Sequence, residues 1–202
     1  MTGPVFILLA TLAYGLLHSV LASLRVKALA RRLFGPAADH WYRLAYNLLA
    51  VVTLIPVLGL LAASPDRPLY RFAQPWRTLA LFGQGFAVLL AAYSLLKTDL
   101  GDFLGLRRAL GLPMPENPAL VVDGLYRWVR HPLYTASLLF LWLSPVMTVN
   151  RLAFYAALTV YIVIGAWLEE RKLLVEFGDT YAAYRRRVPM LFPLFWQIPF
   201  GN

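Results

Sequence analysis

Cysteine is absent from this 202-residue chain, and charged residues are scarce. Without cysteine the chain cannot form disulfides, thiolate metal sites or iron–sulfur clusters, and it has no cysteine nucleophile. Charged residues make up 14% of the sequence and hydrophobic residues 60%, whereas soluble domains carry about 25% charged residues. This balance argues against a soluble protein. The length predicts one compact domain without room for a separate soluble catalytic domain.

Acidic residues are scarcer than basic ones, with ten Asp and Glu against nineteen Lys and Arg and a net charge of +9. In a soluble protein such an excess would suggest a nucleic-acid partner. In a chain this apolar, basic loops beside a lipid surface are the simpler account. No basic patch is interleaved with aromatic residues outside the expected membrane rim, which disfavours nucleic-acid binding. We therefore expect the lipid bilayer as the partner.

Long apolar runs dominate the sequence and predict an all-α polytopic integral membrane protein with about five transmembrane helices. The runs that are long enough cover residues 1–24, 44–63, 78–96, 133–149 and 152–168. Only Asn150 and Arg151 separate the last two runs, so we expect a tight antiparallel hairpin, with Pro145 bending its first helix.

The distribution of basic residues predicts the orientation in the membrane. Fifteen of the nineteen follow the first, third or fifth run, and four follow the second or fourth. The positive-inside rule then places the N-terminus outside and the C-terminus in the cytoplasm. Nine of the ten acidic residues fall on the same cytoplasmic side, so we expect polar chemistry there. The Ala, Leu and Arg richness suits a bacterial cytoplasmic (inner) membrane.

We interpret residues 1–202 as a single membrane domain with four parts. These are a three-span part at 1–97, a cytoplasmic loop at 98–132, the helical hairpin at 133–168 and a cytoplasmic tail at 169–202. Pro113, Pro115 and Pro118 predict that the loop crosses the cytoplasmic face as an ordered, non-helical segment. A loop of this length is often functional.

The densest cluster of polar and aromatic residues flanks the predicted hairpin. GLYRWVRHPLYTA begins at Gly124 before it, and WLEERKLLVEFGDTYAAYRRRVPMLFP follows it. Pro132 suits the first turn of a helix, so Arg130 and His131 would lie at a helix amino end, which attracts anions. Antiparallel packing would bring Glu169 and Glu170 to the same depth. Taken singly, these residues also suit a headgroup anchor and a solvated helix end.

The order of the residues adds a resemblance. The block 124–193 resembles the carboxyl-terminal half of the membrane methyltransferases typified by isoprenylcysteine carboxyl methyltransferase and phospholipid methyltransferase. The matched positions are Gly124, Tyr126, Arg130, His131, Pro132, Tyr134, Glu169, Glu170, Phe177, Gly178, Tyr181, Tyr184, Val188 and Pro189. The resemblance implies S-adenosyl-L-methionine as the cofactor, in a cytoplasmic pocket formed by the last hairpin, the preceding loop and the tail. No metal is expected.

The resemblance implies a set of cofactor-binding residues whose chemistry fits that molecule. They are Tyr126, Arg130, His131, Pro132, Tyr134, Glu169, Glu170 and Tyr181. Arginine, histidine and the helix terminus suit the carboxylate of the cofactor, and a glutamate suits its ammonium group or ribose hydroxyls. Tyrosines provide surfaces for adenine stacking or for a cation–π contact with the sulfonium.

A weaker resemblance covers the amino-terminal half. His18 with Ser19, and the segment from Asp102 to Arg107, are similar to pieces of the bacterial methanethiol S-methyltransferases and of NnrU-type membrane proteins. The chain departs from that pattern at Leu100 and Arg108. From this likeness we take Asp102, Arg107 and His18 as the candidate catalytic residues. Each also has a structural interpretation, as an ion pair or as a contact between helices.

We therefore predict a methyltransferase, dependent on S-adenosyl-L-methionine, that acts on a small apolar or lipid-soluble acceptor. A thiol acceptor needs a base, for which Asp102, Glu169 and His131 are candidates. An isoprenylcysteine-like carboxylate needs a cationic clamp, Arg107 or Arg108. The alternatives are a phospholipid amine N-methyltransferase, an NADPH-dependent reductase related to sterol reductases, and a non-enzymatic NnrU-like helper or transporter component. We expect a monomer.

Overall fold

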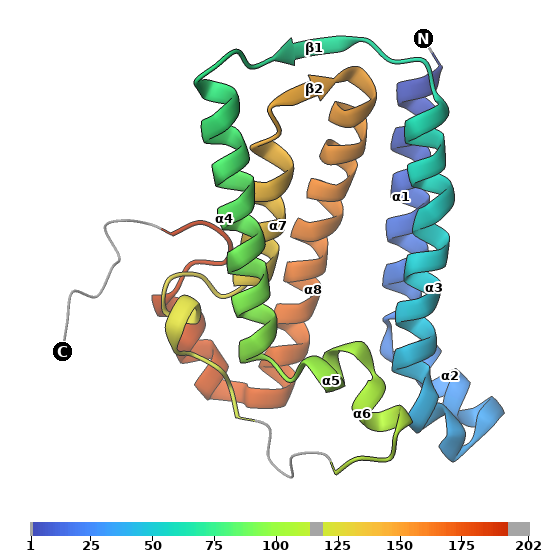
Figure 1. The fold of residues 1–202 in the computed structure, drawn as a ribbon. Coiled ribbons are helices and arrows are strands. Elements are labelled where there is room, and N and C mark those ends of the chain that lie inside the picture. The colour runs from blue at the N-terminus through green and yellow to red at the C-terminus, as the bar shows by residue number, and fades with distance from the viewer. Residues whose placement is uncertain (1, 114–118, 194–202) are drawn as a thin grey trace. The chain divides into compact units, whose positions relative to one another are not determined.

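The computed structural model describes residues 2–113 and 119–193, and most of them are helical (Figure 1). In chain order the elements are α1 (Gly3–Leu21), α2 (Leu24–Phe34), α3 (Pro36–Ala63), β1 (Pro68–Arg71), α4 (Trp76–Lys97), α5 (Leu100–Leu104), α6 (Leu106–Ala109), a 3₁₀ turn (Gly124–Arg127), α7 (Pro132–Trp142), β2 (Val146–Thr148) and α8 (Val149–Arg187). The two strands pair in a small sheet. The predicted all-α class is confirmed.

The chain forms two compact units, each built from segments that are distant in sequence. The first unit comprises Met1–Tyr70, Asp99–Asn117 and Met147–Tyr161, and the second comprises Arg71–Thr98, Pro118–Val146 and Ile162–Asn202. The four-part single domain stays a prediction.

In the first unit, α1 and α3 pack side by side (Figure 1). Ile7, Val57 and Phe154 are buried together and join these helices to the start of α8. The Tyr42 hydroxyl of α3 donates a hydrogen bond of 2.5 Å to the carbonyl of Leu21, the last residue of α1. This bond fixes the end of α1 against α3.

In the second unit, α4 packs along α7 (Figure 1). The close approach depends on Gly83, where an added Cβ would lie 2.7 Å from the Cδ1 atom of Leu143. The Gln84 side chain donates a hydrogen bond of 2.8 Å to the Phe140 carbonyl of α7. Gly83 therefore lets α4 approach α7 closely, and the Gln84 side chain links the two helices by a hydrogen bond.

Within residues 2–113 and 119–193, four helices are long and apolar enough to cross a membrane: α1, α3, α4 and α8. Large apolar side chains stay exposed along them, among them Phe6, Leu16, Val51, Phe82 and Leu89. Such exposure would be unfavourable in water but is expected of surfaces that face lipid. The chain is an integral membrane protein.

The fourth predicted run forms a shorter helix than the sequence suggested. Residues 133–149 were predicted as one span, but α7 ends at Trp142, and residues 146–148 form β2. Pro145 therefore lies outside the helix and does not bend it, and the tight helical hairpin is wrong in this detail. The physical reason is that proline offers no amide hydrogen to continue a helix and disfavours the helical conformation of Ser144 before it.

The predicted non-helical loop at 98–132 is wrong at its start, where α5 and α6 form. Asp99 caps α5 by accepting a hydrogen bond of 3.0 Å from the Asp102 amide. Gly105 joins the two helices at φ +82°, and an added Cβ there would lie 2.5 Å from the Leu44 nitrogen of α3. Pro113 follows these helices, while Pro115 and Pro118 lie outside the described residues, as do Met1 and residues 194–202 of the predicted tail.

The predicted cytoplasmic tail is largely a continuation of α8. Helical structure extends to Arg187, with a kink at Gly178, whose φ of +51° suits glycine. The kink redirects the last part of the helix, which carries Tyr181, Tyr184 and Arg185. These residues reach the polar cluster described below.

Candidate functional site

A backbone connection between the loop before α7 and residues 189–190 forms the base of the site. The amide of Arg130 donates to the carbonyl of Pro189 at 2.9 Å, and the amide of His131 donates to the carbonyl of Met190 at 3.1 Å. The Thr135 hydroxyl donates to the Leu191 carbonyl at 2.6 Å. These bonds hold residues 189–191 against the amino end of α7.

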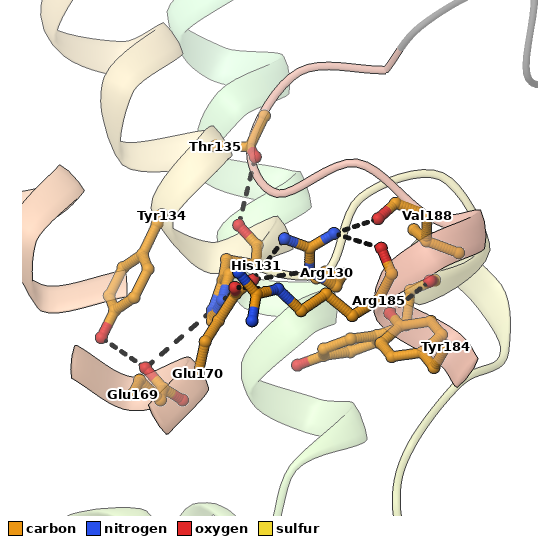
Figure 2. A network of polar contacts seen from close by, with 10 residues as sticks. Arg130, His131, Tyr134, Thr135, Glu169, Glu170, Tyr184, Arg185 and Val188 are labelled. Carbon is orange, nitrogen blue, oxygen red and sulfur yellow. Dashed lines mark hydrogen bonds and ion pairs between the residues drawn. The ribbon is translucent and has the colours of Figure 1, made fainter. Parts of the chain in front are cut away.

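Arg130 is committed to other protein groups. Its Nε donates to Oε1 of Glu170 at 2.5 Å, and its Nη1 donates to the carbonyls of Arg185 and Val188 (Figure 2). The side chains of Arg130 and Glu170 are only 8% and 2% exposed. The pair therefore joins the segment before α7 to α8 and to Val188 after it, and it has little surface left for a ligand.

Arg185 completes the charge balance of this network. Its Nε lies 3.2 Å from Oε2 of Glu170, so the buried carboxylate faces two guanidinium groups. Unlike Arg130, its side chain is 46% exposed. In the sequence, Arg185 is one of the basic residues that follow the last apolar run, and the one signal for its role is its position directly after Tyr184.

His131, Tyr134 and Glu169 form another edge of the cluster (Figure 2), where His131 is buried and Glu169 is half-exposed. The Tyr134 hydroxyl donates to Oε2 of Glu169 at 2.8 Å, and its ring stacks on His131 with a centroid distance of 5.4 Å. Nδ1 of His131 lies 4.0 Å from the same Glu169 oxygen. The Glu169 side chain is 45% exposed, so its carboxylate is accessible to a cationic ligand.

Burial sets the protonation of the His131 imidazole. It lowers the pKa of His131, although Glu169 and Glu170 act in the opposite direction. The imidazole is therefore neutral near pH 7. Its Nε2 lies 3.4 Å from Oε1 of Glu170 but is a buried atom without a hydrogen-bond partner among the described residues.

Tyrosines cover another side of the cluster. The Tyr184 hydroxyl donates to the Tyr126 carbonyl at 2.6 Å, and the Tyr184 ring lies 5.9 Å from that of Tyr181. Tyr181 is 1% exposed, and its hydroxyl has no hydrogen-bond partner among the described residues. Burial, and then the charge of Glu169, raises the pKa of Tyr126. Its phenol therefore stays protonated at neutral pH.

The residues predicted to bind a cofactor thus lie together in the second unit. Pro132 begins α7, as predicted, and His131 is the residue before its first turn. Thr135, Tyr184 and the Val188 carbonyl are further members of the network. Among the residues that the structure describes, no group of three or more His, Cys, Asp or Glu could hold a metal ion.

Asp102 and Arg107 belong to a separate ion-pair network in the first unit. Oδ2 of Asp102 accepts a hydrogen bond of 2.5 Å from Arg43, and Oδ1 accepts one of 2.9 Å from Arg108. Arg107 pairs with Asp99 at 2.8 Å and donates to the Pro113 carbonyl. The sequence motif therefore fastens α5 and α6 to α3.

His18 also lies in the first unit, surrounded by tyrosines. Its Nε2 is hydrogen-bonded to the Tyr46 hydroxyl, and its ring stacks on Tyr14 with a centroid distance of 5.9 Å. Tyr161 meets the same imidazole edge-on at 5.8 Å. The histidine thus connects α1, α3 and the start of α8.

The sequence is similar to those of known methyltransferases. A methanethiol S-methyltransferase from Mycobacterium tuberculosis is 33% identical over 183 residues, which cover 87% of this chain and 72% of that protein. One from Pseudomonas deceptionensis is 39% identical over 119 residues, covering 56% of this chain and 44% of the relative. The protein-S-isoprenylcysteine O-methyltransferase of Schizosaccharomyces pombe is 39% identical over 80 residues, or 37% of this chain and 33% of that enzyme.

The chain spans about half the length of the first curated relatives that it matches. No protein-family model matches the sequence, and no solved structure matches it at a significant level. The similarity to the mycobacterial protein nevertheless extends through most of both chains. The chain belongs to the family of membrane methyltransferases that includes methanethiol S-methyltransferase.

Proposed function

We propose that this chain is an integral membrane methyltransferase that uses S-adenosyl-L-methionine and methylates a small apolar or lipid-soluble acceptor. The observation that carries the proposal is the group of Glu169, His131 and Tyr134 at the amino end of α7, in a chain whose named relatives are methyltransferases. The acceptor is a thiol or an isoprenylcysteine-like carboxylate, because the relatives are named for these two classes.

The polar groups of the cluster fit those of S-adenosyl-L-methionine. Glu169 offers a half-exposed carboxylate, oriented by Tyr134, for the ammonium group. Nε2 of His131 and the Tyr181 hydroxyl are buried polar atoms for which a polar ligand would supply the missing partners. When bound, the cofactor supplies an electrophilic methyl group on its sulfonium.

We assign positioning roles to Arg130 and Glu170. Their charges are satisfied by each other, by the Arg185 side chain and by the Arg185 and Val188 carbonyls, so they shape the site by holding the last turns of α8 against the segment before α7. Arg185 is the accessible cation of this network. It is therefore the better candidate to meet the carboxylate of the cofactor.

A thiol acceptor must lose a proton, and His131 is the best-placed base. Its imidazole is neutral near pH 7, because burial lowers its pKa, so it is able to accept a proton. Asp102 is a weaker base. Burial acts to raise its pKa, but the Arg108 hydrogen bond and the charge of Arg43 hold it below the ordinary value. We therefore propose that Asp102, with Arg107, positions α5 and α6, and that His18 positions the tyrosines around it.

Binding of the cofactor to detergent-purified protein tests the proposal. Calorimetric titration with S-adenosyl-L-methionine and with S-adenosylhomocysteine should give micromolar affinity for wild-type protein. Glu169→Gln should weaken binding about tenfold or more, because a charge-assisted hydrogen bond is lost. The matched control is Glu176→Gln, an exposed acid on the same helix, which should bind normally.

The outcomes separate the function classes. Absence of binding by folded wild-type protein would contradict the methyltransferase proposal, and binding of NADPH instead would favour a reductase. With binding established, methyl transfer to methanethiol and to an isoprenylcysteine is compared to identify the acceptor. Normal cofactor binding by Glu169→Gln would show that this residue does not bind the cofactor. The methyl-transfer assay would still decide whether the protein is a methyltransferase.

We further propose that the protein lies in the bacterial inner membrane with its N-terminus outside. The cluster of Glu169, Glu170 and Arg185 is then on the cytoplasmic side, where S-adenosyl-L-methionine is made. An acceptor dissolved in the bilayer would approach from the lipid. Holding both reactants together and excluding water supplies much of the rate enhancement in a methyl transfer.

A further inference from the structure

Helix α2 has a composition unlike that of the spanning helices. It follows α1 after only Ala22 and Ser23, and the Ser23 hydroxyl caps it by accepting a hydrogen bond from the Val26 amide at 3.4 Å. Gly35, at φ +60°, then ends it and leads into α3. Figure 1 shows α2 at the end of the α1 and α3 pair. It therefore lies where the first apolar span ends.

The basic residues of α2 lie opposite a face of four apolar residues, although Leu24 and Ala28 fall on the basic side. With 3.6 residues per turn, Val26, Leu29, Ala30 and Leu33 fall on one face. The other face carries every charged residue of the helix, and all of these residues are basic: Arg25, Lys27, Arg31 and Arg32.

The apolar face of α2 is only partly covered: Val26 and Ala30 are half-buried, and the helix contacts α3, but Leu29 and Leu33 are exposed. None of its residues is buried, and Leu29 and Leu33 are 52% and 68% exposed. Arg31 pairs with Asp39 at 3.3 Å, but both side chains are largely exposed. A pair this exposed is weak, so it leaves most of the positive charge of α2 available to a ligand. Among the described residues, nothing buries Leu29 and Leu33, which lie beside the basic face of the helix.

Large aromatic residues next to α2 indicate its depth in the membrane. Phe34 ends the helix and Trp41 lies in the first turns of α3, and they are 69% and 55% exposed. Tryptophan gathers at the level of lipid headgroups, where its ring meets both apolar and polar surroundings. This placement is independent of the charge pattern of α2.

We propose that α2 is an interfacial helix that binds the anionic phospholipid surface of the bilayer. Leu29 and Leu33 enter the boundary between headgroups and acyl chains, and the four basic residues meet lipid phosphates. An anionic lipid is favoured over a protein partner because the helix carries cations without any acid and adjoins a spanning helix. The assignment does not depend on the methyltransferase proposal.

Because the chain has no cysteine, single cysteines for spin labels test the depth of each face. Leu29→Cys and Leu33→Cys report the apolar face, and Arg25→Cys and Arg32→Cys the basic face, in the full chain in vesicles of phosphatidylcholine with phosphatidylglycerol. Labels at 29 and 33 should collide more with oxygen than with a water-soluble nickel chelate. Labels at 25 and 32 should show the reverse.

The lipid charge is tested by omitting phosphatidylglycerol, which should reduce the preference for oxygen at position 29. A variant with Gln in place of all four basic residues of α2 should lose this dependence on phosphatidylglycerol. Gln in place of Arg67, Arg71 and Arg77, which lie outside α2, should preserve it. Equal access of the nickel chelate to all four labels would overturn the proposal. Spin–spin broadening at position 29 would do so as well, because it would place a second copy on this face.

Discussion

At the scale of single residues, Arg130 joins three segments, and its loss should show mainly in stability. Arg130→Gln leaves the buried Glu170 carboxylate with one guanidinium, that of Arg185, and removes the donor to the Arg185 and Val188 carbonyls. Removing one member of a buried pair costs about 3 kcal/mol, so the melting temperature in detergent should fall by several degrees. Arg171→Gln is the control, because Arg171 is exposed and stacks over Trp167 at 3.6 Å. Equal melting temperatures for the two variants would contradict the assigned role.

His131 should make stability depend on pH in a defined direction. Burial lowers its pKa in the folded protein, so the unfolded chain, with a histidine pKa of about 6.5, binds more protons below that value. The stabilising contribution is complete above about pH 6.5 and is lost as the pH falls through the folded pKa. Melting temperatures measured between pH 8 and pH 5 should therefore decline on acidification. The decline should be smaller in His131→Asn, and a wild-type protein that becomes more stable on acidification would exclude this linkage.

The cluster itself could be predicted from the sequence, but the partners of its members could not. The order of tyrosines, Arg130, His131 and the two glutamates indicated one site, and they do lie together. The carbonyl of Val188, 58 residues from Arg130, has no side-chain signature, so its bond to the guanidinium was invisible. For the same reason, the sequence could not reveal that protein groups satisfy the hydrogen bonds of Arg130 while the side chain of Arg185 stays half-exposed.

At the scale of elements, Gly105 sets how closely α5 and α6 approach α3. Gly105→Ala places a Cβ 2.5 Å from the Leu44 nitrogen, and backbone cannot move aside cheaply. The positive φ adds about 1 to 2 kcal/mol of strain. We expect a loss of more than about 2 kcal/mol, measured as the melting temperature and as faster proteolysis after Arg107 or Arg108. Gly59→Ala in α3, where a Cβ meets nothing within 4 Å, should be neutral, and a similar loss there would show that the test lacks specificity.

The helix boundaries show which sequence signals are reliable. Residues 78–96 were predicted as a span and α4 covers Trp76–Lys97, because an uninterrupted apolar run has no competing structure in a membrane. Helix α2 was missed because its evenly mixed residues form no apolar run, although the 3.6-residue period was present. The length of an apolar run predicts a membrane-spanning helix well. It does not predict amphipathic helices or the residues at which helices end.

At the scale of the whole molecule, the short α7 raises the question of how the chain crosses between α4 and α8. Its 11 residues span about 16 Å at 1.5 Å per residue, roughly half of the hydrocarbon core. Within the first unit, however, the Val149 amide donates to the Arg67 carbonyl at 3.1 Å, and the Asn150 amide donates to Asp66 at 3.1 Å. Within that unit, the start of α8 therefore lies at the same level as the segment that follows α3.

This arrangement makes the orientation testable in three places. In the cysteine-free chain, Arg67→Cys and Arg151→Cys should react with a membrane-impermeant maleimide in intact spheroplasts, because both lie on the predicted outer side. Arg186→Cys, an exposed residue near the end of α8, should react only after permeabilisation, as the excess of basic residues on its side requires. Labelling of Arg151→Cys together with Arg186→Cys, and not with Arg67→Cys, would mean that α7 fails to cross. Glu169 and the start of α8 would then lie on the same side of the membrane. That result would contradict a membrane-spanning α8, because a spanning helix places its two ends on opposite sides.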